Sequence, residues 1–525
     1  MSDARLDSPA GEGDALAGED DDAEESPVVG PSKPRLLRVL GPGLITSASD
    51  DDPSGIATYG QAGAQLGYGL CWTLLYSLPL MVAVQMISAR IGRTTGHGIA
   101  GVLARHHPGA VLQGVVLLLL AANVLNLGAD LGAMADAVTL LLPGPRWAYV
   151  VAFALGCTLM QVGLRYARYV AVLKWLTLSL FAYPAVLAVA HVSWRDLALG
   201  VLLPRLDASR ETLTTLVALF GTTISPYLFF WQAAEEAEDL VAYPRRSDLL
   251  HAPDQGGPAL RRIEIDTLVG MGFSNLVALA IMATTAAVLH ANGVADIRTS
   301  ADAAEALRPL AGPFASGLFA LGIVGTGLLA VPVLAGSAAY AIGEARRWPV
   351  GFGRRVLEAR AFYATVALAT GFGMAVSLGA IDPIRALYWS AVVNGVVAVP
   401  IMAVMMRIAA RTGIMGAFAI RGPLRALGWI ATVLMLGAVL AMFGMVWLNR
   451  VVACSGCLQS PPMGLRADHL VGNVDRPNGL IFLWCMILDT SHRLEVGIGI
   501  CMGATPIREV RRVEFDRTIH APLPP

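Results

Sequence analysis

Long apolar runs repeat along most of this chain, and they constrain its fold more than any other feature. About 20 apolar residues in a helix cross about 30 Å of hydrocarbon. Helices of soluble proteins keep a polar stripe, whereas here only 15% of the residues are charged. We therefore predict an all-α polytopic membrane protein with about 11 transmembrane helices, at residues 43–67, 71–91, 111–142, 149–162, 170–192, 213–234, 268–289, 317–342, 361–380, 386–406 and 426–448.

Basic residues indicate how these helices are oriented. Lys33, Arg35 and Arg38 precede the first predicted helix, and every second loop after it is rich in arginine, as at 245–246 and 261–262. The intervening loops carry few basic residues. Under the positive-inside rule the N terminus is cytoplasmic. We expect a protein integral to the plasma membrane, in bacteria the inner membrane, without a cleaved signal peptide, because the N-terminal segment has no basic start followed by an apolar core.

The two ends differ in composition from the middle. Residues 1–35 are predicted to form a disordered cytoplasmic tail, because acidic residues among Gly, Ala, Ser and Pro offer little apolar surface to bury. Residues 36–449 form the predicted transmembrane transport domain. Residues 450–525 are a mixed C-terminal appendage of unknown order. Its Cys454 and Cys457 pair lacks a second close Cys or His pair, so the spacing does not support a zinc site.

The first predicted helix carries charge where a membrane helix tolerates little. Residues 49–55 read Ser-Asp-Asp-Asp-Pro-Ser-Gly within an otherwise apolar segment. Acidic residues inside a membrane are costly and mark functional sites by default. Pro53 and Gly55 break the helix at the same place, which frees backbone carbonyls. Carboxylates beside free carbonyls predict a cation site.

A second break is expected in the sixth predicted helix. Residues 221–227 read Gly-Thr-Thr-Ile-Ser-Pro-Tyr, and Pro226 removes a backbone donor near the middle of the span. An ordinary proline kink would explain either break taken alone. Breaks in helices one and six, with four unbroken helices between them, favour two inverted five-helix repeats. In such folds the substrate binds where the two breaks meet.

These motifs resemble those of the Nramp divalent-metal transporters. The run Gly41-Pro-Gly-Leu-Ile-Thr46, followed by Asp52-Pro53-Ser54-Gly55 and Gln61-Ala-Gly-Ala-Gln-Leu-Gly-Tyr68, looks like the first helix of that family. Residues 91–96 and Pro108 resemble the loop after its second helix. The resemblance covers roughly residues 36–449 and implies a LeuT-like fold with 5+5 inverted repeats and broken helices 1 and 6.

The departures from the family pattern point to one branch of it. Asp52 matches the metal-binding Asp, but Gly55 stands in place of the Asn, Ser225 in place of the Met, and Tyr227 in place of the His. The family's carbonyl ligand matches Thr222. Without a soft sulfur ligand the site suits hard ions, and small residues leave room for the waters that Mg²⁺ retains. The pattern resembles the smaller Nramp-related magnesium transporter branch, and the expected metal site comprises Asp52, Gly55, Thr222, Thr223 and Ser225.

Other polar residues are expected to support this site or to line the ion's path. Gln232, Glu235 and Glu236 share one face of helix six, where pairing with Arg245 and Arg246 is the alternative. Asn394 is expected to line the site from the tenth predicted helix, and an interhelical hydrogen bond is the equal alternative for its side chain. Asp130 matches one acid of the family's proton route, and Leu127 replaces the other. The expected supporting residues are Asp51, Ser54, Tyr227, Gln232, Glu235, Glu236, Asn394 and Asp130.

These features predict a secondary transporter that moves Mg²⁺, and Mn²⁺ secondarily, into the cytoplasm by alternating access without proton coupling. The alternative is a proton-coupled Mn²⁺ or Fe²⁺ importer, a symporter of the main Nramp type. An intramembrane enzyme is a third class, but no His-Glu-x-x-His or Gly-x-Ser-x-Gly motif occurs in the spans. The expected partners are the transported divalent ion and the bilayer, with no cofactor, no nucleic acid and no obligatory protein partner.

Overall fold

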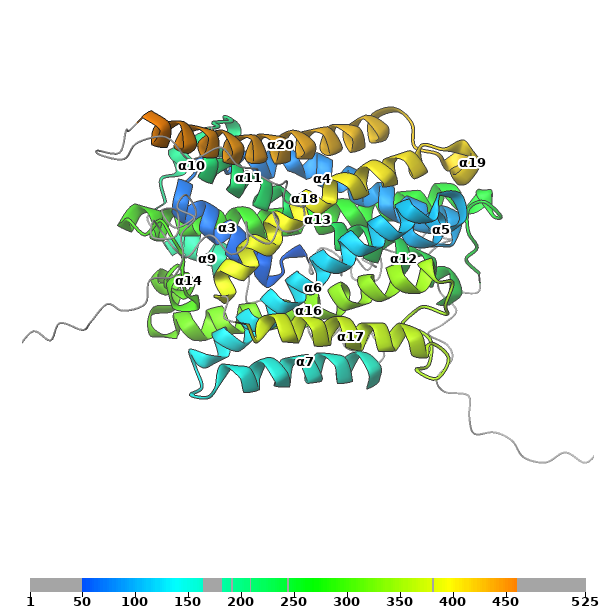
Figure 1. The fold of residues 1–525 in the computed structure, drawn as a ribbon, viewed down its shortest axis with the longest axis horizontal. Coiled ribbons are helices and arrows are strands. Elements are labelled where there is room, and N and C mark those ends of the chain that lie inside the picture. The colour runs from blue at the N-terminus through cyan, green and yellow to red at the C-terminus, as the bar shows by residue number, and fades with distance from the viewer. Residues whose placement is uncertain are drawn as a thin grey trace, which may run out of the picture. The chain divides into compact units, whose positions relative to one another are not determined.

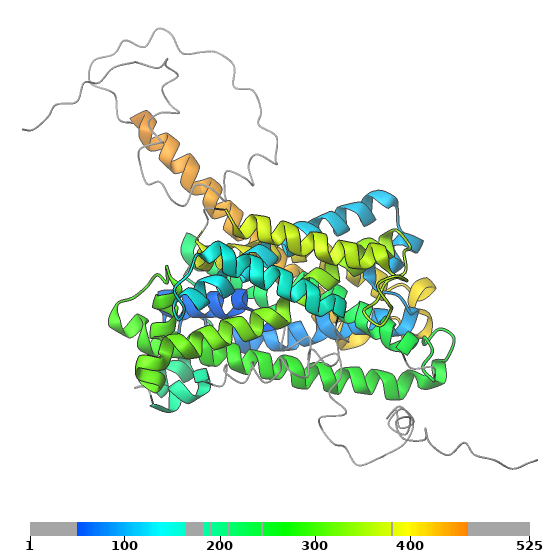
Figure 2. The same ribbon diagram turned by 90° about the horizontal axis from the view of Figure 1, so that it is seen from below.

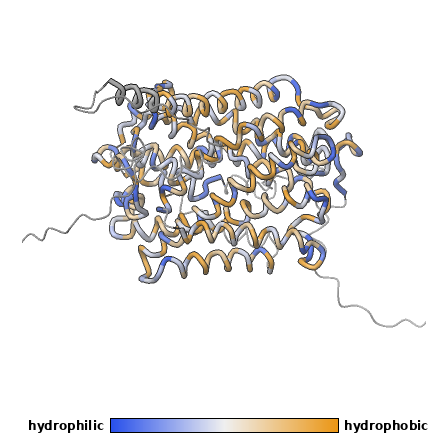
Figure 3. Tube along the Cα trace, in the orientation of Figure 1, coloured by the Kyte–Doolittle hydropathy of each residue, from blue (hydrophilic) through white to orange (hydrophobic). Residues whose placement is uncertain are grey.

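Every regular element in the part of the chain that the structure describes is a helix. The structure is a computed structural model that describes residues 50–163, 182–189, 192–207, 209–242, 245–379 and 382–459. Seven stretches there are long and apolar enough to cross a membrane: 72–95, 109–139, 210–241, 253–292, 308–345, 383–409 and 422–448. Figure 3 shows apolar residues along the middle of most helices, with polar residues mainly towards their ends.

The described helices follow the predicted spans in chain order (Figure 1), and most of the predicted span 170–192 lies outside the described residues. The longer ones are α4 (Trp72–Thr95), α6 (Gly109–Thr139), α7 (Arg146–Gly163), α11 (Arg210–Thr223), α12 (Pro226–Ala242), α13 (Gly256–Val288), α16 (Ala315–Ala345), α17 (Arg360–Ser377), α18 (Pro383–Ala409) and α20 (Gly422–Gln459). The shorter ones are α3 (Pro53–Leu66), α5 (Ile99–His106), α9 (Ala182–Val189), α10 (Trp194–Leu202), α14 (Ser300–Glu305), α15 (Arg308–Ala311) and α19 (Thr412–Met415).

Both predicted helix breaks are present. Helix α3 begins at Pro53, and Asp52 before it has an extended backbone and caps the helix with its side chain. The sixth predicted span is two helices, because α11 ends at Thr223 and α12 starts at Pro226. Ile224 between them has a non-helical backbone, with φ −123° and ψ 61°. Proline cannot donate the hydrogen bond that would continue the preceding helix, so its position explains both interruptions.

Small residues let the helices around the breaks approach closely. Helix α3 packs against α11, α13 and α18, and α11 packs along α18. At the crossing of α11 and α18, a Cβ atom added to Gly221 would lie 2.0 Å from the carbonyl oxygen of Ala391. Only glycine fits such a backbone contact, and close approach of this kind is a usual basis for helix association in membranes. The crossing fixes the position of Thr222 next to it.

We expect Gly221→Ala to destabilise the protein. The added methyl group meets backbone atoms of α18, which cannot move aside without shifting that helix, so the cost is about 1–3 kcal/mol. Gly114→Ala is the matched control, because a Cβ there meets nothing within 4 Å. The midpoint temperature of thermal unfolding in detergent should fall for Gly221→Ala and not for Gly114→Ala. Equal midpoints would contradict the close crossing.

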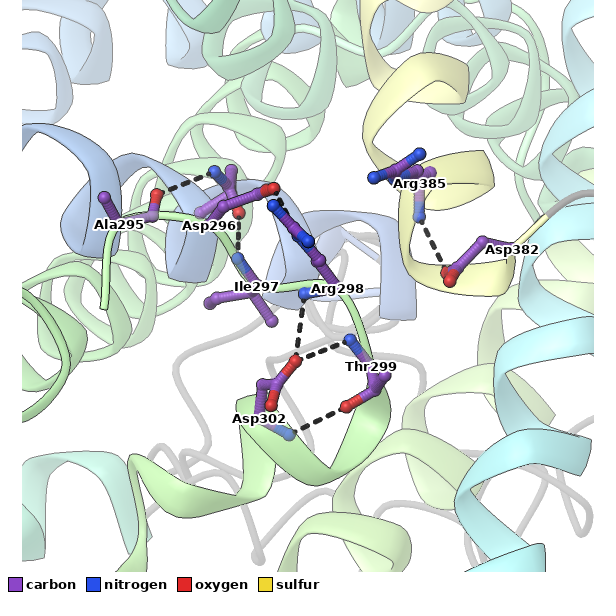
Figure 4. A network of polar contacts seen from close by, with 9 residues as sticks. Ala295, Asp296, Ile297, Arg298, Thr299, Asp302, Asp382 and Arg385 are labelled. Carbon is purple, nitrogen blue, oxygen red and sulfur yellow. Dashed lines mark hydrogen bonds and ion pairs between the residues drawn. The ribbon is translucent and has the colours of Figure 1, made fainter. Parts of the chain in front are cut away.

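The loop after α13 lies against α3. Gln61 of α3 donates to the carbonyl of Ala295 at 3.2 Å and accepts from the amide of Ile297 at 2.9 Å. Thr299 and Asp302 then form a capping box at the start of α14 (Figure 4). These contacts hold the connection between α13 and α16 over the end of α3 that is farther from its break.

Helix α20 runs to Gln459, past the end of the predicted transmembrane domain at residue 449. Figure 2 shows its last turns extending away from the neighbouring helices. The predicted acidic tail and residues 460–525 of the predicted appendage lie outside the described residues, so the proposed domain limits stay predictions.

Candidate cation site at two helix breaks

Asp52 lies at the break before α3 and is fixed there by hydrogen bonds. Its side chain is about 1% exposed. One carboxylate oxygen accepts from the Gly55 amide and the Ser54 hydroxyl, each at 2.7 Å, and the other accepts from the Tyr227 hydroxyl at 3.1 Å. Helix N-termini present unpaired amides and a positive dipole end, which explains why an acidic residue caps α3. Tyr227 belongs to α12, so the carboxylate joins the two broken helices.

Gly55 marks the point where the two breaks meet. A Cβ atom added there would lie 3.1 Å from the carbonyl oxygen of Asp50 and 3.3 Å from the Thr222 hydroxyl oxygen. The first turn of α3 therefore contacts the last turn of α11. An asparagine at residue 55 would require a shift of these neighbours, so the glycine allows the two breaks to approach this closely.

The hydroxyl groups of α11 and its break are used mainly within their own helix. Ser225 donates to the carbonyls of Gly221 and Thr222, at 2.9 and 2.8 Å. Thr223 donates to the carbonyl of Leu219 at 2.9 Å. The Ser225 hydroxyl covers carbonyls next to the break, where Pro226 cannot donate, whereas Thr223 bonds back within its own helix. Among Thr222, Thr223 and Ser225, it is the Thr222 hydroxyl oxygen that approaches Gly55.

Two acidic residues beside Asp52 share a contact that the sequence did not reveal. Ser274 of α13 lies 2.8 Å from a carboxylate oxygen of Asp50 and 3.2 Å from one of Asp51. All three side chains are about 1% exposed. Asp51 was expected near the site, whereas Asp50 was not selected and Ser274 was missed. A lone serine in an apolar helix is too common to single out without knowing which helix it faces.

Polar groups on α6 and α18 are buried without hydrogen bonds in the described part of the chain. Both carboxylate oxygens of Asp130 and both amide atoms of Asn394 lack a partner there. The interhelical hydrogen bond that was one alternative for Asn394 is therefore not formed with any described residue. The carboxyl group of Asp130 lies close enough to Asp52 for the two to interact electrostatically. Leu127, one turn away on α6, is fully buried.

Two acidic residues on the polar face of α12 pair with arginines of neighbouring segments. Glu236 is fully buried and pairs with Arg262 at 2.5 Å, and Asp239 pairs with Arg246 at 2.7 Å. Glu236 therefore has a counter-charge within the protein. The expectation that Gln232, Glu235 and Glu236 line the ion's path stays a prediction. The arginine partners of Glu236 and Asp239 were not predictable from helical spacing.

The adjacent face of α12 lines a cavity of about 660 Å³. Ala234, Ala237, Glu238 and Val241 contribute to it, at spacings that put them on one side of the helix. The loop after α4, the end of α16 and the loop before α17 complete the walls. Glu238 accepts from the Phe352 and Gly353 amides, at 3.2 and 2.6 Å, and from the Tyr340 hydroxyl. Glu238 is thus the acidic residue of α12 that sequence reasoning should have selected.

Comparison with known proteins identifies relatives over most of the chain. Residues 43–444 match the family model of natural resistance-associated macrophage protein-like (Nramp) proteins. The divalent metal cation transporter MntH of Burkholderia ambifaria is 30% identical over 410 residues, which cover 77% of this chain and 87% of that protein. MntH of Deinococcus radiodurans is 27% identical, over 77% and 88% of the two chains.

The fold also has a match among solved structures. The crystal structure of the Eremococcus coleocola manganese transporter, in complex with an aromatic bis-isothiourea substituted compound, covers 80% of this chain and 96% of its own, with a TM-score of 0.61. The sequence identity is 16%, so this likeness concerns the fold alone. Together with the two broken helices it confirms the predicted all-α, LeuT-like fold.

Proposed function

Because this chain belongs to the Nramp family, as its motifs indicated, we propose that it transports divalent metal cations across a membrane, with Mg²⁺ as its main substrate. Its relatives are named as transporters of divalent metal cations, which supports the general class and favours it over an enzyme. The observation that carries the proposal is the placement of Asp52, a buried carboxylate where two broken helices meet. An anionic group beside interrupted helices suits a cation at mid-membrane depth.

The preference for Mg²⁺ rests on which atoms surround Asp52. Gly55 and Ser225 replace the amide and thioether that the resemblance leads one to expect, so oxygen atoms remain as the available ligands. Hard oxygen donors suit Mg²⁺, Ca²⁺ and Mn²⁺, whereas thioethers favour softer metals. Mg²⁺ usually keeps several waters and uses one or two carboxylates. Asp52 with the Thr222 hydroxyl and carbonyl, completed by waters, fits that requirement, with Mn²⁺ as a secondary substrate.

Transport is proposed to proceed without protons. Tyr227, which replaces the expected histidine, donates to Asp52 and so takes part in orienting the carboxylate. Leu127 replaces one acid of the expected proton route with an apolar residue. A potential that is negative inside drives a divalent cation inwards without a coupled ion. We propose a bacterial inner-membrane protein with its N terminus in the cytoplasm, in keeping with the arginine-rich alternate loops.

One observation favours the second candidate, a proton-coupled Mn²⁺ or Fe²⁺ importer. Asp130 is fully buried, and its carboxylate has no hydrogen bond to any described residue. A buried acid in that state, within reach of the charge of Asp52, is suited to carry a proton. The two candidates differ in the ion preferred and in whether the lumen of a vesicle acidifies during uptake.

Uptake into proteoliposomes tests the proposed substrate. Purified protein in liposomes, with a potassium diffusion potential negative inside, should take up Mg²⁺ with an initial rate roughly tenfold above that of Mn²⁺ at equal concentrations, a difference of about 1.4 kcal/mol. Empty liposomes give the background. Uptake of Mn²⁺ with no uptake of Mg²⁺ would contradict the magnesium assignment and favour the main family type.

A further inference from the structure

We propose that Asp50, Asp51 and Ser274 form a second divalent-cation site beside the one at Asp52. The inference rests on the proposed function only for the identity of the ion, a hard divalent cation of the Mg²⁺ type. Asp50 and Asp51 belong to the segment before α3, and Ser274 belongs to α13, so the site joins residues more than 200 positions apart in the chain.

The geometry brings two carboxylates together on one hydroxyl group. The Ser274 oxygen is 2.8 Å from an oxygen of Asp50 and 3.2 Å from one of Asp51. A serine hydroxyl has a single proton, so it donates fully to only one of these carboxylates at a time. The second oxygen of each carboxylate has no hydrogen-bond partner among the described residues, although both are buried. Two oxygens from neighbouring residues are therefore available to a ligand.

A cation would balance the charge of ionised Asp50 and Asp51. No ion pair in the described part of the chain involves Asp50 or Asp51, and both side chains are about 1% exposed. A buried carboxylate without a counter-charge costs several kcal/mol. Two such groups side by side repel each other as well. A divalent cation between them supplies two positive charges and replaces the missing hydrogen-bond donors.

Tyr59 gives an independent indication of a ligand at this place. Its side chain is about 1% exposed, and its hydroxyl completes no hydrogen bond of standard geometry, although Thr222 lies near. The ring edge of Tyr59 and the carbonyl oxygen of Asp50 flank the same point above Gly55. The Tyr59 phenol group lies close enough to Asp50 and Asp51 to interact electrostatically with both carboxyl groups. A neutral oxygen without a partner beside two carboxylates suits a cation or a water bound to it.

This second site is separate from Asp52 in its hydrogen bonding. The Asp52 carboxylate already accepts three hydrogen bonds, from Ser54, Gly55 and Tyr227, and none of them involves Ser274. Asp50 and Asp51 instead contact Ser274 of α13. Two carboxylates with neutral oxygens are typical ligands of Mg²⁺, Ca²⁺ and Mn²⁺, whereas softer metals prefer sulfur or imidazole. The ion path would then hold two cations in adjacent positions.

Counting bound ions in the full-length purified protein tests the inference. We would measure Mg²⁺ binding by isothermal titration calorimetry and equilibrium dialysis, in choline chloride so that Na⁺ is absent. Wild type should bind about two ions per chain. Asp52→Asn and the double variant Asp50→Asn/Asp51→Asn should each bind about one, and the triple variant none. Asparagine keeps the size of each side chain, and a monodisperse elution profile confirms that each variant is folded.

Ser274→Ala separates a positioning role from a general structural one. Loss of one hydroxyl contact to a carboxylate should weaken one of the two binding events by roughly tenfold and leave the other unchanged. Thr285→Ala is the matched control on α13, because the Thr285 hydroxyl bonds only to the carbonyls of Ile281 and Met282 in its own helix. Equal effects of the two variants would overturn the assignment of Ser274.

The outcomes distinguish this inference from the proposed function. Two bound ions per chain, one of them lost in Asp50→Asn/Asp51→Asn, support the second site even if Mg²⁺ uptake into liposomes fails. A single bound ion in wild type, lost in Asp52→Asn, overturns the second site even if uptake proceeds. Binding of Na⁺ instead of Mg²⁺ at Asp50 and Asp51, seen when sodium chloride replaces choline chloride, would overturn the divalent assignment as well.

Discussion

Asp52→Asn is expected to reduce the initial rate of Mg²⁺ uptake into proteoliposomes by roughly 100-fold or more. The change removes one buried negative charge and leaves the other ligands in place, and loss of a buried charged partner costs about 3 kcal/mol or more. Asparagine caps helices as well as aspartate does, so the hydrogen bond to the Gly55 amide can persist. The midpoint of thermal unfolding should therefore stay close to that of wild type while uptake is lost.

Asp382→Asn provides the matched control for this result. Asp382 also caps a helix, accepting from the Ile384 and Arg385 amides at the start of α18, at 3.0 and 3.5 Å. It undergoes the same chemical change in the same structural role, at a place that is half-buried and away from the helix breaks. Uptake by this variant should match wild type. Full Mg²⁺ uptake by Asp52→Asn would refute the assignment of Asp52 as the ion's charged ligand.

Ser225→Met is expected to shift selectivity from Mg²⁺ towards Mn²⁺ and Cd²⁺. The substitution places a thioether at the second break and removes the hydroxyl that covers the Thr222 carbonyl. Thioethers favour softer transition metals. We expect the ratio of apparent affinities for Mn²⁺ and Mg²⁺ to rise by roughly tenfold, which corresponds to about 1.4 kcal/mol. Competition of each cold ion with radioactive Mn²⁺ uptake measures this ratio.

Ser225→Ala separates the new sulfur from the lost hydroxyl. Both variants expose the Thr222 carbonyl, but only the methionine adds a soft ligand. The larger side chain also enters a site that is about 2% exposed, so some loss of stability accompanies it. A selectivity shift of the same size in Ser225→Ala would contradict the role given to the sulfur atom.

The parts of the site that were predictable from sequence are those set by local chemistry. Pro53 and Pro226 interrupt their helices whichever neighbours those helices pack against. Both breaks were therefore found in the expected spans. Asp52 precedes a proline at a helix start, which makes it a cap, and its contact with Gly55 follows from that position. The long apolar runs predicted the helices because a membrane requires that length.

Contacts between distant segments were not predictable in the same way. The spacing on α12 predicted one face with Gln232, Glu235, Glu236 and Asp239, but nothing local indicated that Glu236 meets Arg262 of α13. Glu238, one position before Asp239, lines the cavity instead. Ser274 was missed for the same reason, because its significance depends on Asp50, more than 200 residues earlier in the chain.

The number of charges that cross the membrane with each Mg²⁺ ion tests the central claim most directly. Reversal potentials, set with potassium gradients across proteoliposomes and read from zero net Mg²⁺ flux, give this ratio, while a pH dye inside reports protons. Uncoupled transport predicts two charges per ion, a reversal potential that does not depend on the pH gradient, and no acidification. A reversal potential that moves with the pH gradient, with acidification that follows Mg²⁺ entry, would contradict it.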